Sequence, residues 1–425
     1  MWGKCCCSLA VSLLLVAACT AFPDHDHTLE SHNHPHHDKG EPHASHDHDH
    51  EKCHVLAPHN ADFAFSLYKK LSALPDSKGK NVFFSPLGLT MALSLLALGA
   101  KGETHTELFK TLGYSDLSPA QVNEAYEHLL QMLDQSHDAG LQLESGSAVA
   151  IREGFKVLDK FLQDAQHFYK SEAFTVDFAK PETAAQEINK YIAKKTHDKI
   201  TDMVKGLDPD NIMMLINYIF FRGKWEKPFE LKHTHKADFH VDENTKVQVD
   251  MMKRTGRYDF YYDQGNHSSV LMLPYKGNAS MMIILPDKDK MAEVEQLLSK
   301  EQIKHWHSSV FRSSVDICLP KFSISATYSL GDPLKEMGVV SAFSDTADFA
   351  GMSEETKLKV SKISQKAVLS VDEKGTEAAA ATTIEIMPMS LPDSMELNRP
   401  FLLLIVDDST KSILFMGKIT DPTAE

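Results

Sequence analysis

Near its carboxyl end the chain runs Glu373-Lys374-Gly375-Thr376-Glu377-Ala378-Ala379-Ala380-Ala381-Thr382-Thr383-Ile384-Glu385-Ile386-Met387-Pro388-Met389-Ser390. Alanine and threonine dominate its first half, and these small, uncharged residues suit the core of a β-sheet. The second half places the Met389–Ser390 bond close to prolines on both sides, and its composition is that of a protease substrate. The segment therefore combines a sequence that can enter a sheet with one that a protease can cut.

The first half also has the alternation of a strand. In an extended chain every second side chain faces the same side. The residues that would form the core-facing row are Thr376, Ala378, Ala380 and Thr382. A charge in that row would carry a large desolvation penalty, whereas small neutral residues cost little. Glu377 points to the other side, and Gly375 lets the backbone turn from strand into loop at low strain.

Length and charge limit the class of protein. At 425 residues, with 42% hydrophobic and 24% charged residues, the composition is that of an ordinary globular protein with a large core. The formal net charge of −15 argues against nucleic acid or an anionic membrane as the main partner, because both attract a basic surface. The sequence also lacks the common motifs of hydrolases, zinc proteases and nucleotide-binding enzymes, so no catalytic activity is expected.

The amino terminus has the pattern of a targeting segment. Lys4 precedes an apolar run from Leu9 to Ala18, and the small residues Cys19-Thr20-Ala21 follow. This pattern predicts a signal peptide over residues 1–21, since the apolar run is too short to span a bilayer. We therefore expect a secreted, extracellular, plasma-like protein. Four of the six cysteines leave with the signal peptide, and Cys53 and Cys318 are expected to remain as free thiols.

Residues 22–54 differ in composition from everything that follows. They hold 11 of the 23 histidines and almost no large apolar residue, which predicts a disordered tail that includes Cys53. The densest candidates for metal binding are His25, His27, His46, His48 and His50. Imidazoles next to carboxylates can bind zinc or copper weakly. The alternative is a solvated, pH-responsive tail without any metal cofactor.

Apolar periodicity predicts helices first and strands later in the chain. Helices are expected near 60–71, 87–100, 119–133, 155–168, 183–197 and 291–306. Strands are expected at 82–86, 213–221, 239–251, 270–273, 280–285, 315–324, 368–371, 401–407 and 413–417. Because the two kinds of element do not alternate regularly, the pattern indicates an α+β fold with a large mixed sheet.

Five further motifs carry a family resemblance. They are Asn81-Val82-Phe83-Phe84-Ser85-Pro86, Asn217-Tyr218-Ile219-Phe220-Phe221-Arg222-Gly223-Lys224-Trp225, Leu319-Pro320-Lys321-Phe322, Leu397-Asn398-Arg399-Pro400-Phe401 and Phe415-Met416-Gly417-Lys418. In this order, with the alanine-rich segment just before Leu397, they resemble the serpin family. The resemblance covers essentially residues 55–425.

The resemblance implies one serpin domain over residues 55–425, of α+β class. It implies a large central mixed β-sheet, further sheets, about nine helices and an exposed reactive-centre loop at about 373–392. Cleavage at Met389–Ser390 would place Glu373 seventeen positions along the chain, counting both ends, which is typical of the hinge of inhibitory members. The residues expected where the sheet opens are Ser85, Pro86, Asn217 and Trp225.

On this resemblance the chain is a monomeric serine protease inhibitor that is cleaved, inserts its loop and traps the protease. Met389 suits the specificity pocket of elastase-like or chymotrypsin-like enzymes. The alternatives are a non-inhibitory serpin that acts as a carrier, or metal binding through the tail. The helix near 119–134 contains no lysine or arginine, so heparin is not expected to bind. Asn266 and Asn278 begin glycosylation sequons.

Overall fold

A computed structural model describes residues 52–136, 140–354, 358–373 and 391–424. All of them belong to one compact unit, residues 45–425. The expected signal peptide, nearly all of the tail with its five candidate metal-binding histidines, and residues 374–390 lie outside the described residues. The last range includes Gly375, Thr376, Glu377, Ala378, Ala380, Thr382, Met389 and Ser390.

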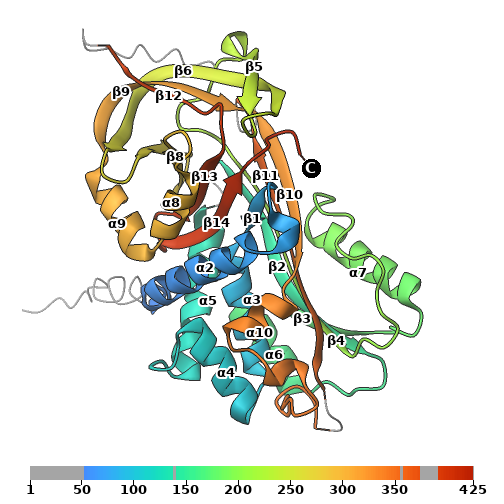
Figure 1. Cartoon of the computed structure of the whole chain (residues 1–425). Helices are drawn as coiled ribbons and strands as arrows, with labels where there is room; N and C mark the ends of the chain where they lie inside the picture. Colours follow the sequence, from blue (N-terminus) through green and yellow to red (C-terminus); the bar gives the residue numbers. More distant parts are fainter. Residues whose placement is uncertain (1–51, 137–139, 355–357, 374–390, 425) are drawn as a thin grey trace, which may run out of the picture. The chain divides into compact units, whose positions relative to one another are not determined.

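A five-stranded mixed sheet lies at the centre of this unit (Figure 1). Its order is β10 (Phe322–Ser329), β11 (Val360–Val371), β4 (Met213–Gly223), β2 (Leu141–Arg152) and β3 (Glu172–Val176). The pairs β10·β11 and β2·β4 are antiparallel, whereas β11·β4 and β2·β3 are parallel. The neighbours β11 and β4 in the middle of the sheet therefore run in the same direction.

A second sheet of nine strands packs at one end of the first (Figure 1). Its order is β1 (Val82–Phe84), β14 (Ser412–Ile419), β13 (Phe401–Asp407), β8 (Ala279–Pro286), β7 (Ser268–Pro274), β6 (Lys246–Asp263), β9 (Phe311–Pro320) and β12 (Asp393–Glu396), with β5 (His235–His240) paired to β6. Because β12 follows residues 374–390 and pairs with β9, the far end of the expected loop is anchored in this sheet.

Nine α-helices complete the part of the chain that the structure describes. They are α2 (Ala57–Ser72), α3 (Pro86–Leu98), α4 (Gly102–Leu112), α5 (Pro119–Ser136), α6 (Asp159–Tyr169), α7 (Pro181–Lys195), α8 (Met291–Leu297), α9 (Lys300–Ser309) and α10 (Gly331–Met337). Helix α3 is apolar all round and buried, as its sequence predicts. The α+β class, the mixed central sheet and the number of helices are confirmed.

Strand β4, in the middle of the central sheet, is buried on both faces because its side chains contribute to two cores. Along β4, Met213, Leu215, Ile219 and Phe221 pack into the main core, whereas Met214, Ile216, Tyr218 and Phe220 pack into a smaller core under α7. Such burial on both faces explains why β4 is a continuous apolar run in sequence.

Three sequence predictions merge elements that are separate in the structure. The strand expected at 239–251 is two strands, β5 and β6, because the polar turn Asp242-Glu243-Asn244 intervenes. The helix expected at 291–306 is α8 and α9, since Ser299 caps a new helix by accepting a hydrogen bond from the Gln302 N–H. The strand expected at 315–324 divides at Lys321 into β9 and β10, which belong to different sheets.

The boundary expected after His54 is wrong for Cys53 and His54. The Cys53 side chain is fully buried, and its thiol donates to Met132 Sδ at 3.5 Å. His54 Nε2 lies 2.8 Å from the Ser409 carbonyl oxygen. Both contacts exist because Cys53 and Leu56 are apolar and pack into the core from one helical turn. Both described cysteines are free, and burial raises the pKa of Cys53 to about 11.

Candidate functional site

The hinge of the expected loop, defined here as Asp372 and Glu373, is held by several polar contacts at the end of β11. The backbone carbonyl of Glu373 accepts a hydrogen bond from the Phe229 N–H at 2.9 Å. Its carboxylate accepts another from the Thr234 hydroxyl at 3.0 Å and lies 3.0 Å from Lys321 Nζ. The side chain of Glu373 is buried, so the point at which the alanine-rich segment begins is firmly attached to the fold.

The charge of Glu373 is stabilised despite its burial. Burial alone would raise the pKa of the carboxyl, but a hydrogen bond from Glu373's own backbone N–H and the contacts with Lys321 and Thr234 outweigh it. The pKa of Glu373 is therefore lowered from its ordinary value. The carboxylate stays ionised at neutral pH and keeps its bond to Lys321.

Asp372 attaches the hinge to the neighbouring strand. Its carboxylate pairs with Arg222 of β4 at 2.5 Å, and its carbonyl oxygen accepts a hydrogen bond from Trp225 Nε1 at 2.8 Å. Trp225 stacks on Tyr275, with ring centroids 4.4 Å apart. The hinge is therefore connected to the carboxyl end of β4, directly across the parallel pair of strands.

The strand order allows one particular insertion, that of a new strand between β11 and β4. A segment that follows β11 and folds back beside it runs antiparallel to β11. Because β4 is parallel to β11, the same segment is also antiparallel to β4. Inserted between them, it would replace one parallel ladder, from Val360 to Leu369, with two antiparallel ladders, which are slightly more stable per residue.

Beneath this pair of strands a buried polar bridge joins Gln365, Asn217 and Ser85. Gln365 of β11 is fully buried, and its amide donates to Asn217 Oδ1 of β4 at 2.7 Å and to the Ser85 carbonyl at 2.9 Å. Its Oε1 accepts from the Ser85 N–H at 2.9 Å. Opening the sheet between β4 and β11 therefore breaks the bond between Gln365 and Asn217.

Helix α3 fits beneath this bridge because of Ser85, Pro86 and Gly88. Ser85 caps α3 by accepting a hydrogen bond from the Gly88 N–H, and Pro86 occupies the first helical position. A Cβ at Gly88 would lie 2.4 Å from Asn217 Oδ1, so only glycine allows this close approach.

The four residues expected where the sheet opens lie at two different places in the structure. The fold brings Ser85, Pro86 and Asn217 to one place, and it puts Trp225 at the hinge instead. Sequence reasoning missed Gln365, Arg222 and Lys321 as partners. Gln365 and Asn217 stand opposite one another in the strand register, and no motif signals that pairing before the register is known.

The two sequons differ in accessibility. Asn278 is exposed in the turn between β7 and β8. Asn266 is half-buried, and its amide donates to Asp263 Oδ2 at 2.7 Å. Asp263 also accepts from Trp306 Nε1, and Ser268 of the same sequon is fully buried. The geometry favours Asn278 as the acceptor of a glycan.

The described residues also bear on metal binding and membrane insertion. In those ranges no three His, Cys, Asp or Glu side chains gather where they could hold a metal ion. No helix in the same part of the chain is both long and apolar enough to cross a membrane.

Comparisons with known proteins agree with this architecture. A family model described as Serpin (serine protease inhibitor) matches residues 58–422. The chain is 66% identical over 323 residues to an alpha-1-antitrypsin homolog of Cyprinus carpio, which covers 76% of this chain and 87% of that protein. It is 46% identical over 378 residues to alpha-1-antiproteinase of Bos taurus, covering 88% of this chain and 90% of that protein.

Solved structures give the same result. Human thyroxine-binding globulin in complex with thyroxine is similar with a TM-score of 0.83 and 38% identity, over 88% of this chain and 100% of that chain. Human kallistatin is similar with a TM-score of 0.81 and 38% identity, over 89% of this chain and 100% of that chain. Within the family, the Met389–Ser390 pair and its prolines resemble alpha-1-antitrypsin, and the named relatives confirm that likeness over 76% and 88% of the chain. The chain therefore belongs to the serpin family of serine protease inhibitors.

Proposed function

We propose that this chain is a secreted, monomeric inhibitor that traps elastase-like or chymotrypsin-like serine proteases after cleavage at Met389–Ser390. The observation that carries the proposal is the adjacency of β11 and β4 as parallel strands, with the hinge residue Glu373 directly after β11. The alanine-rich segment that begins there has the small neutral residues that a core-facing strand requires. Family membership supports the same mechanism.

A comparison of free energies indicates what drives insertion of the loop into the sheet. A new strand of about a dozen residues forms roughly ten to twenty ladder hydrogen bonds, each contributing about 0.5–1.5 kcal/mol net. Ordering the segment costs about 1–2 kcal/mol per residue and cancels much of that gain. The remaining driving force therefore has to come from strain that is stored in the uncleaved fold and released on cleavage.

The choice of protease follows from Met389. Its flexible apolar side chain fits an apolar specificity pocket, and no arginine or lysine lies beside the bond. Secretion is supported by the signal-peptide pattern of residues 1–21.

The test is to mix the protein with pancreatic elastase and run a denaturing gel. A band that survives boiling, close to the summed mass less the released fragment that follows Met389, indicates a covalent acyl-enzyme, as expected. Cleavage to a slightly shorter chain without that band would contradict the proposal. It would favour the second candidate, a non-inhibitory carrier, to which the likeness to thyroxine-binding globulin points. Direct titration with thyroxine would then test the carrier function.

A further inference from the structure

A pocket of about 670 Å³ lies apart from the hinge and the polar bridge. Three connections line it: the turn between β5 and β6, the connection from β8 to α8, and the connection from β12 to β13. Its apolar wall includes Val241, Pro286, Met291 and Pro400. The volume is sufficient for a small organic molecule.

Arg399 is the half-buried arginine of this pocket, whereas Lys288 is an exposed cation at its rim. The Nε of Arg399 donates to the Pro286 carbonyl oxygen at 3.2 Å. Among the described residues no carboxylate forms an ion pair with it within 4.0 Å. A guanidinium has five N–H donors, so most of its hydrogen-bonding capacity is available. Burial lowers the pKa of Arg399, and the more distant charges of Asp287 and Glu396 do not offset that effect.

Carboxylates at the rim limit how much negative charge a ligand can carry. Asp242 and Asp287 already accept hydrogen bonds, from the Asn244 N–H at 2.8 Å and the Tyr262 hydroxyl at 2.9 Å. Glu243 and Asp289 are exposed lining residues, as is Lys288, so four carboxylates outnumber the cations Lys288 and Arg399. The charges of these carboxylates would repel a dianion or a polyanion, whereas one anionic group next to Arg399 would gain a charge-assisted hydrogen bond.

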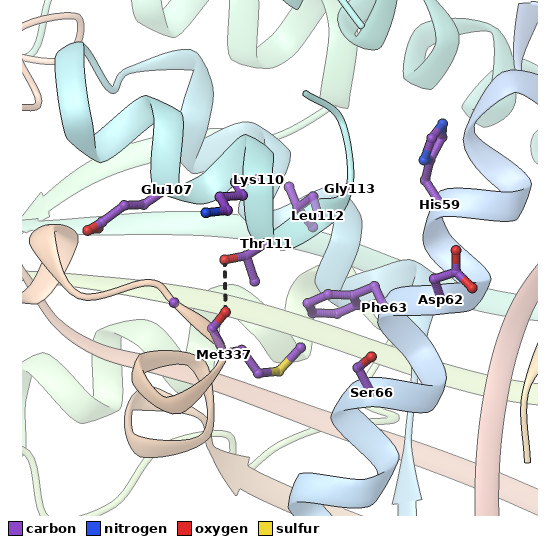
Figure 2. Close-up of a pocket in the computed structure, with 11 residues that line it drawn as sticks. His59, Asp62, Phe63, Ser66, Glu107, Lys110, Thr111, Leu112, Gly113 and Met337 are labelled. Atoms are coloured by element: carbon purple, nitrogen blue, oxygen red, sulfur yellow. Dashed lines mark hydrogen bonds between the residues drawn. The ribbon is translucent and has the colours of Figure 1, made fainter. Parts of the chain in front are cut away.

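The pocket between α2, α4 and α10 provides a contrast (Figure 2). Its polar side chains are largely engaged with the protein itself. Asp62 pairs with Lys300 at 2.7 Å, and Glu107 accepts the Ser341 N–H at 2.9 Å. Thr111 donates to the Met337 carbonyl oxygen, as Figure 2 shows. That pocket therefore lacks a half-buried charge that needs a partner.

We propose that the Arg399 pocket binds a small amphipathic ligand with an apolar body and a single carboxylate. The carboxylate forms a bidentate pair with the Arg399 guanidinium, and the apolar body packs against Val241, Met291 and Pro400. This binding is independent of protease inhibition, because the pocket includes neither the hinge nor the strands that separate.

Isothermal titration of the full chain with three related probes tests the ligand class. The probes are 2-naphthoate (one negative charge), 2-naphthamide (neutral) and naphthalene-2,6-dicarboxylate (two negative charges). We expect 2-naphthoate to bind at one site per chain. The amide and the dianion should bind at least about tenfold more weakly, since a charge-assisted bond is lost or rim repulsion is added.

Three variants locate the site. Arg399→Gln should weaken 2-naphthoate binding at least about tenfold by removing the charge. Met291→Trp fills the space in front of the apolar wall and leaves Arg399 in place, so it should abolish binding. This variant tests the location of the site even if Arg399→Gln fails to fold. Arg312→Gln changes an arginine of β9 outside the pocket and should bind like the wild type.

Near-ultraviolet circular dichroism identifies the variants that remain folded. The proposal is overturned if 2-naphthoate shows no saturable binding, or if the amide binds as tightly as the acid. It is also overturned if a folded Arg399→Gln or Met291→Trp variant binds like the wild type. Inhibition of elastase by each variant is measured separately, so failure of this proposal is distinguished from failure of the proposed function.

Discussion

Lys321 Nζ lies 3.0 Å from Oε2 of Glu373, and this pair joins the start of β10 to the hinge. Glu373→Gln removes the charge but keeps the shape of the side chain. Because Lys321 is 43% exposed and therefore screened by solvent, we expect the free energy of unfolding at neutral pH to fall by only about 1 kcal/mol. Urea denaturation measures the change. The control is Glu293→Gln, which removes an exposed partner of Lys290 and should change little.

The same pair predicts a pH dependence. The folded-state pKa of Glu373 lies below its ordinary value of 4.5. Its contribution is therefore complete above the unfolded pKa and is lost as the pH falls through the folded-state pKa. The stability difference between wild type and Glu373→Gln should shrink below pH 4.5. A difference that stays constant down to the folded-state pKa would contradict the assignment.

The buried bridge gives a second prediction. Gln365→Leu leaves the Ser85 N–H and Asn217 Oδ1 without their partner, and each unsatisfied buried group costs about 1–3 kcal/mol. We expect a lower thermal midpoint and, on heating, polymers formed through the opened sheet. Gln163→Leu, an exposed change on α6, is the matched control. Unaltered stability of Gln365→Leu would mean that the bridge does not hold β4 and β11 together.

The sequence predicted those parts of the fold in which local pattern determines the outcome. Helix α3 was predictable because a long run that is apolar all round has few alternatives, although Ser85 and Pro86, expected in the strand at 82–86, are its cap and first residue. The break at Lys321 was missed, although the apolar positions shift by one residue there, from Val315, Ile317 and Leu319 to Phe322 and Ile324, where the chain crosses to another sheet. The partner of Asn217 depends on the register between strands that are distant in sequence, so Gln365 could only be found in the structure.

A third prediction concerns the core-facing row, which lies outside the described residues. Thr376→Arg should convert the inhibitor into a substrate, since burying an unpaired guanidinium in the sheet opposes insertion. The bait bond would still be cut, but no complex would survive boiling on a denaturing gel. Glu377→Arg is the matched control, because in an extended register its side chain points to the opposite side. If Thr376→Arg still trapped the protease, the register would be wrong.

A fourth prediction concerns the bait bond itself. Met389→Arg places a cation where the specificity pocket of the protease binds, so inhibition should shift from elastase towards trypsin. The ratio of the two association rate constants measures the shift. Met387→Arg, two residues away, should cause a smaller shift. An unchanged preference for elastase in Met389→Arg would place the cleaved bond elsewhere.

The last prediction separates the two sequons. Asn278→Gln should remove a glycan from protein secreted by cultured animal cells, because Asn278 is exposed in a turn. Asn266→Gln should leave the glycan mass unchanged and keep the fold, since a glutamine amide can still reach Asp263. Asn266→Ala should instead lower the thermal midpoint, because the buried Asp263 carboxylate loses the donor at 2.7 Å. Intact mass before and after glycosidase treatment measures occupancy. Loss of a glycan in Asn266→Gln would show that the chain is modified there before Asp263 and Ser268 enclose the site.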